Sequence, residues 1–107
     1  MIDWNKVLDE AIAAARQVIG GQWPTIANSA TTQITSLVEN AKFIEDNKAS
    51  MSVMEYNATK INQQEALKGV LATFAAITIM VAEQVAAAVW GVVEAALKTI
   101  PELAAFI

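Results

Sequence analysis

Residues 69–93 read GVLATFAAITIMVAEQVAAAVWGVV and carry one formal charge, Glu83, beside one amide, Gln84. The stretch is long enough for a membrane span, which needs about 20 mostly apolar residues. However, an ionised side chain near the centre of a spanning helix costs a few kcal/mol, and no aromatic belt brackets this segment. The pattern therefore favours a helix buried against protein. A membrane span is the second interpretation, and a segment that changes environment is the third.

Helical geometry supports the first interpretation. On a straight helix, Glu83, Gln84 and Glu94 fall on one polar line about 100° wide, together with Thr73 and Lys98. The remaining circumference is apolar. This combination of a wide apolar arc and one solvated edge is typical of a helix inside a bundle.

The composition of the chain indicates a partner. It has 107 residues, enough for a single domain spanning 1–107, and 55% of them are hydrophobic, which is more than in ordinary soluble domains. A small domain has a large surface relative to its volume, so it cannot easily hide such an excess. We therefore expect contact with protein or lipid, although much of the excess is alanine, which surfaces tolerate.

Several classes of function are disfavoured by the residues that are absent. The chain has no cysteine and no histidine, which excludes thiolate chemistry, catalytic triads and the usual metal sites of helical bundles. Seven basic residues are scattered among eleven acidic ones, giving a net charge of −4, so we expect no nucleic-acid partner. A metal cluster of Glu65, Glu83 and Glu94 is conceivable, but a solvated acidic line explains these residues better. We expect a non-enzyme with no cofactor and no small-molecule substrate.

Two amphipathic helices are expected before the apolar segment. The first spans 3–19, with Asp3 as its N-cap and Gly20-Gly21 as its end. The second spans 25–46 and follows Pro24, whose fixed φ suits a first helical turn. With the segment that follows, these helices predict an all-α bundle.

A third helix is predicted over 52–98. Ser52 and Glu55 have the spacing of a capping box, although a helix continuing from the second through residue 50 is an alternative. Its first part has a narrow apolar line of Met54, Ala58 and Ile61, which runs toward the polar line of the second part. Since one straight rod cannot turn both apolar sides to one core, we expect a bend near Gly69 or different neighbours for the two halves. Pro101 ends the helix before a short C-terminal turn.

The N-terminal sequence MIDWNKVLDE is acidic and amphipathic. A secretory signal begins with a positive segment followed by an apolar one, and this pattern is absent. We expect a cytoplasmic start or export without cleavage, and the localisation is otherwise open.

Small residues recur at intervals of four in the apolar segment, as in Ala87, Gly91 and Ala95. Such spacing lets two helix backbones approach closely, although alanine also serves simple helix propensity. Together with the apolar excess, it predicts a homo-oligomer joined through the long helix. The predicted contacts are Phe74, Ile77, Val81, Val85, Ala88, Trp90, Val92 and Phe106.

The leading functional hypothesis is a non-catalytic structural or interaction protein that self-associates. The main rival is a membrane-active helical protein, a pore-former or lysis factor, that inserts residues 69–97. A third hypothesis, a helical carrier of apolar ligands, requires an internal cavity.

Overall fold

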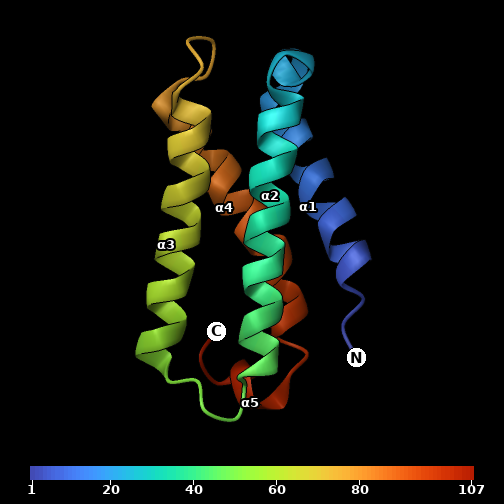
Figure 1. The fold of residues 1–107 in the computed structure, drawn as a ribbon, viewed down its shortest axis with the longest axis vertical. Coiled ribbons are helices and arrows are strands. Elements are labelled where there is room, and N and C mark those ends of the chain that lie inside the picture. Colours follow the sequence, from blue (N-terminus) through green and yellow to red (C-terminus); the bar gives the residue numbers. More distant parts are fainter.

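Four long helices and two short helical turns form the molecule, and the computed structural model describes all 107 residues. The helices run alternately up and down (Figure 1), and there is no strand. The molecule measures 41 × 25 × 17 Å. The elements are α1 (Trp4–Ile19), η1 (Gly20–Gln22), α2 (Trp23–Asp46), α3 (Val53–Ala72), α4 (Ile79–Leu97) and α5 (Pro101–Ala104). The predicted all-α bundle is confirmed.

The first two helices lie where their local signals place them. The Asp3 carboxylate accepts a hydrogen bond from the Lys6 backbone N–H, which caps α1. Gly20 then takes a φ of 65°, the left-handed region that favours glycine, and ends the helix. Pro24 lies in the first turn of α2, where its missing N–H has no helical partner to lose.

The segment 52–98 differs from the prediction because it forms two antiparallel helices. The chain reverses between Thr73 and Thr78, and Gly69 lies within a regular turn of α3. The Thr78 hydroxyl accepts from the Val81 backbone N–H at 3.1 Å and so begins α4. Reversal lets the two halves pack against each other as neighbouring helices of the bundle.

The alternative of one helix running from α2 through residue 50 is also wrong. The chain turns after Asp46, and α3 begins with the predicted capping box. The Ser52 hydroxyl accepts from the Glu55 backbone N–H at 3.1 Å, and the Glu55 carboxylate accepts from the Ser52 backbone N–H at 3.2 Å.

The core is entirely apolar apart from the polar ends of Tyr56 and Trp90, and α4 makes the most extensive contacts with the other helices. Contacts with α1 and α3 cover most of its inner side, and α2 adds a smaller contact. The buried residues of α4 are Ala82, Val85, Ala86, Val89, Trp90, Val93 and Leu97. One side of the most apolar helix is therefore shielded by its own chain.

α3 turns the opposite side inward from the one its apolar line suggests. Met54 is 82% exposed and Ile61 57% exposed, whereas Tyr56, Leu67 and Leu71 are buried. The inner side includes a tyrosine whose polar end is satisfied within the protein, so a count of aliphatic residues alone selects the wrong face.

Candidate functional site

Two features of the structure are candidates for function: the contacts predicted for assembly, and a polar network between α3 and α4. Of the predicted contacts, Ile77, Val85 and Trp90 are buried within the single chain. Little or none of their surface is exposed in this fold. The other predicted contacts are half-buried at the edges of the core: Phe74, Val81, Ala88, Val92 and Phe106.

After Gln84, the exposed side of α4 is made of small residues. Ala87, Gly91 and Ala95 lie one turn apart and are all exposed, with half-buried Ala88 and Val92 beside them. We call these five residues the α4 outer face. No charged residue lies on α4 between Glu83 and Glu94, so this face is uncharged over most of its length.

Gly91 is notable because nothing within the chain requires a glycine there. Its φ is not positive, and a Cβ placed on it would meet nothing within 4 Å. Glycine inside a helix costs about 1 kcal/mol relative to alanine. Neither backbone conformation nor internal packing accounts for that cost.

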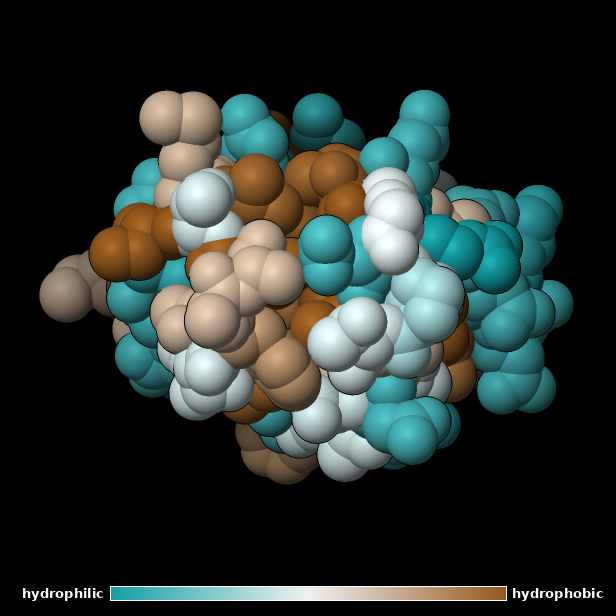
Figure 2. Space-filling model, turned by 90° about the horizontal axis from the view of Figure 1, so that it is seen from above, coloured by the Kyte–Doolittle hydropathy of each residue, from teal (hydrophilic) through white to brown (hydrophobic).

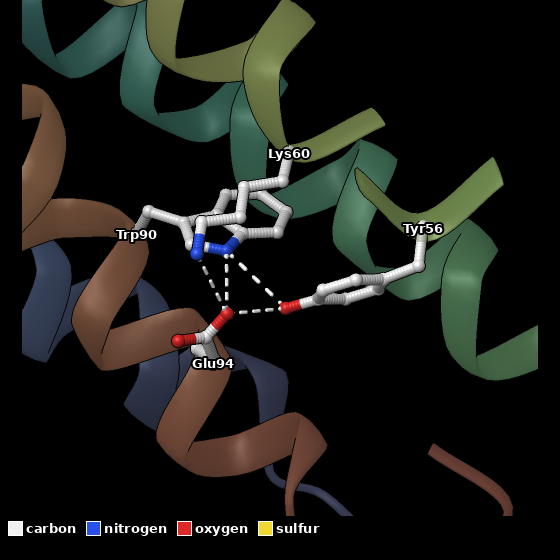
Figure 3. A network of polar contacts seen from close by, with 4 residues as sticks. All are labelled: Tyr56, Lys60, Trp90 and Glu94. Atoms are coloured by element: carbon white, nitrogen blue, oxygen red, sulfur yellow. Dashed lines mark hydrogen bonds and ion pairs between the residues drawn. The ribbon is translucent and has the colours of Figure 1, made fainter. Parts of the chain in front are cut away.

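The second feature is a hydrogen-bonded network of four side chains (Figure 3). Oε2 of Glu94 accepts from the Tyr56 hydroxyl at 2.6 Å, from Nζ of Lys60 at 3.3 Å and from Nε1 of Trp90 at 3.3 Å. Nε1 of Trp90 also donates weakly to the Tyr56 hydroxyl at 3.4 Å. One carboxylate oxygen therefore collects three donors.

Helical spacing produces this convergence. Tyr56 and Lys60 are one turn apart on α3, and Trp90 and Glu94 are one turn apart on α4. The antiparallel hairpin brings the two pairs face to face. The ring of Phe106 packs at a tilt on Tyr56, with 6.3 Å between ring centroids, so the C-terminal residues help to enclose the site.

The network shifts the titration of both of its acidic groups. Burial alone would raise the pKa of the Glu94 carboxyl, but hydrogen bonds from Tyr56 and Lys60, with the charge of Lys60, outweigh burial and lower it. Burial raises the pKa of the Tyr56 hydroxyl, and its hydrogen bond to Glu94 raises it further. Glu94 is therefore ionised and Tyr56 neutral at pH 7.

The chemistry of the network is that of a structural tie. Tyr56 donates its only proton to Glu94, and Lys60 is held as an ion pair with the same oxygen. The network joins α3 to α4 through a charge whose hydrogen bonds come from within the bundle.

The acidic residues considered for a metal cluster lie apart. Glu94 pairs with Lys60, whereas Glu65 and Glu83 both pair with Lys68, at 3.7 and 3.4 Å. No group of three or more acidic side chains is placed to hold a metal ion. The largest hollow, about 550 Å³, is an open groove between the N-terminal residues and α4, with polar as well as apolar walls.

Helix α4 is the one helix long and apolar enough to cross a membrane by length and composition. A core helix of a soluble protein passes the same test, and 33% of its apolar window is buried here. Comparisons with protein families, curated proteins and solved structures find no match to this chain.

Proposed function

We propose that the chain is a non-catalytic interaction protein that self-associates through the α4 outer face. The observation that carries the proposal is Gly91, which lies in the middle of α4 with open space beyond its Cα. Its neighbours one turn away on each side are Ala87 and Ala95, so the face is flat over about two turns. A flat face of this kind lets a second helix approach closely, and that approach would account for the glycine.

The proposal changes the set of contacts predicted from the sequence. Ala88 and Val92 remain, since both are half-buried at the edge of this face. Val85 and Trp90 drop out because they fill the core of one chain. Contacts between copies would be made by small side chains, with Gly91 at the centre.

The experiment is sedimentation equilibrium of the purified chain without detergent, at concentrations up to several hundred micromolar. We expect a discrete oligomer for the wild type. The variant Gly91→Leu should be monomeric, because the larger side chain holds the helices apart while leucine is a good helix former.

Gly69 provides a matched control. It is also an exposed helical glycine with open space at its Cβ position, but Glu65 and Thr73 stand four residues away in place of alanine. Gly69→Leu should leave the oligomer intact. A monomeric wild type, or equal masses for wild type and Gly91→Leu, would refute the proposal. A wild type that stays in solution only with detergent would favour the rival hypothesis, insertion of residues 69–97.

A further inference from the structure

One end of the bundle has an unusual lack of charge. No charged side chain occurs between Arg16 and Glu39, and none between Lys68 and Glu83. The first stretch contains the connection from α1 to α2, and the second contains the connection from α3 to α4. Both connections lie at the same end of the molecule, at the top of Figure 1. The uncharged parts of the sequence are thereby gathered at one end.

Exposed apolar side chains project from this end. Ile79 is 64% exposed and Met80 is 69% exposed, although both begin the most apolar helix of the chain. Figure 2 looks down on this end and shows hydrophobic side chains gathered over its left and middle, with hydrophilic ones mainly on the right. We define the apolar tip as Ala72, Phe74, Ala75, Ala76, Ile79 and Met80, of which only Phe74 is half-buried.

Charged residues lie toward the opposite end, and acidic ones predominate there. Asp3, Glu45, Asp46, Glu55 and Glu102 lie in or beside the connections and termini in the lower part of Figure 1, together with the basic residues Lys48 and Lys98. The molecule is therefore polarised along its long axis, with an uncharged apolar end and an acidic end.

We propose that the apolar tip docks end-on into the surface of an electrically neutral lipid bilayer. Insertion into the boundary between headgroups and acyl chains stabilises in proportion to the apolar area buried and needs no shape-matched partner. Trp23, half-buried at the same end, is the residue type that favours the level of the headgroups. The acidic end would point away from the bilayer.

The size of the tip argues against a second copy of the chain as its occupant. A stable protein interface buries about 800 Å² on each partner and involves about 20–30 residues a side. The tip offers six residues, three of them alanines, and it ends at the connection between two helices, so unlike the α4 outer face it cannot be extended along a helix to reach that size. An anionic membrane is not expected to be the preferred surface. This end has no basic residues to attract it, and the net charge of −4 would be repelled.

The test is co-sedimentation of the full chain with phosphatidylcholine vesicles. The variant Ile79→Glu/Met80→Glu places two carboxylates at the tip. Since Thr78 caps α4, these positions are the first two of the helix, where negative charge is favourable, so the variant should fold. We expect the wild type to bind, and the variant to lose at least tenfold in partition coefficient.

Met54→Glu/Ile61→Glu is the matched control. It makes the same chemical change at one methionine and one isoleucine that are also exposed but lie on the outer side of α3. We expect this control and Gly91→Leu to bind vesicles as the wild type does. Binding should change little with salt, and adding phosphatidylserine should not strengthen it.

Three results would overturn the proposal: a wild type that stays in the supernatant, equal loss in the tip and control variants, or stronger binding with phosphatidylserine. If the wild type does not bind vesicles and the tip variant differs from it in native mass in their absence, the tip is a protein contact instead. Loss of hydrogen-exchange protection throughout α4 on vesicles would indicate insertion of the whole helix and would also overturn end-on docking. Because Gly91→Leu keeps the tip, failure here is distinguishable from failure of self-association.

Discussion

Replacing Tyr56 with phenylalanine removes one hydroxyl from the centre of the α3–α4 network. The ring is buried, and its hydroxyl donates to Oε2 of Glu94 at 2.6 Å. A hydrogen bond to a charged group contributes about 1.5–3 kcal/mol to stability. Two features move the expectation to the lower part of that range. Trp90 keeps Glu94 as a hydrogen-bond acceptor at 3.3 Å, and the Glu94 side chain is 23% exposed, so solvent compensates part of the loss.

We therefore expect Tyr56→Phe to lower the free energy of unfolding by about 1.5–2 kcal/mol at pH 7. Urea unfolding followed by circular dichroism measures this difference, with equal m-values showing that both proteins unfold alike. Glu94→Gln tests the charge, and the double variant gives the coupling energy of the pair. A Tyr56→Phe variant as stable as the wild type would refute the assigned role of the network, as would a coupling energy near zero.

Three further predictions concern pH and stability. Because the pKa of Glu94 is lowered, its contribution to folding stability is present above pH 4.5, its usual pKa, and is lost as the pH falls through its pKa in the folded chain. The difference in free energy of unfolding between the wild type and Glu94→Gln should therefore disappear in urea titrations at acid pH. Because the pKa of Tyr56 is raised, its contribution to folding stability is present below pH 10.0 and declines at higher pH, where the unfolded chain loses the phenolic proton first. The variant Tyr56→Phe should lack this decline. In the wild type, absorbance at 295 nm should show that tyrosinate forms only at a pH above the usual one. Val85→Ala should cost about 2 kcal/mol in urea unfolding while leaving the native mass unchanged, since Val85 lies in the core; a changed mass with unchanged stability would restore it as an assembly contact.

The parts of the fold that followed from the sequence were those with strong local signals. Asp3, Gly20 and Pro24 marked the ends of the first two helices, and Ser52 with Glu55 marked the start of the third. Each acts through its own backbone or its immediate neighbours, so the signal needs no knowledge of the tertiary structure.

The chain reversal after α3 was missed because its residues carry no breaker. Residues 73–78 contain neither glycine nor proline, and alanine and phenylalanine suit a helix as well as a loop. The available signal was Thr78, which has the right residue type for an N-cap before an apolar run. Tertiary packing decides here, because only a reversal lets the inner sides of α3 and α4 meet.

The polar network was missed for a related reason. Tyr56 and Lys60 count as polar in a periodicity argument, which therefore selects the aliphatic line of Met54 and Ile61 as the inner side, although both residues are exposed. The Tyr56 hydroxyl and the Lys60 ammonium can face α4 because both donate hydrogen bonds to Glu94, which lies 34 residues beyond Lys60. Such a long-range pairing leaves no periodic trace in the sequence.

The hairpin of α3 and α4 is the feature on which the rest of the account depends, and zero-length carbodiimide cross-linking tests it most directly. Nζ of Lys60 lies 3.3 Å from Oε2 of Glu94 in the folded chain. In one continuous helix, the 34-residue separation would place these residues about 51 Å apart. With a mixture of isotopically light and heavy protein, we expect the Lys60–Glu94 cross-link within single chains. Cross-links found only between light and heavy chains, or none at this pair, would contradict the hairpin.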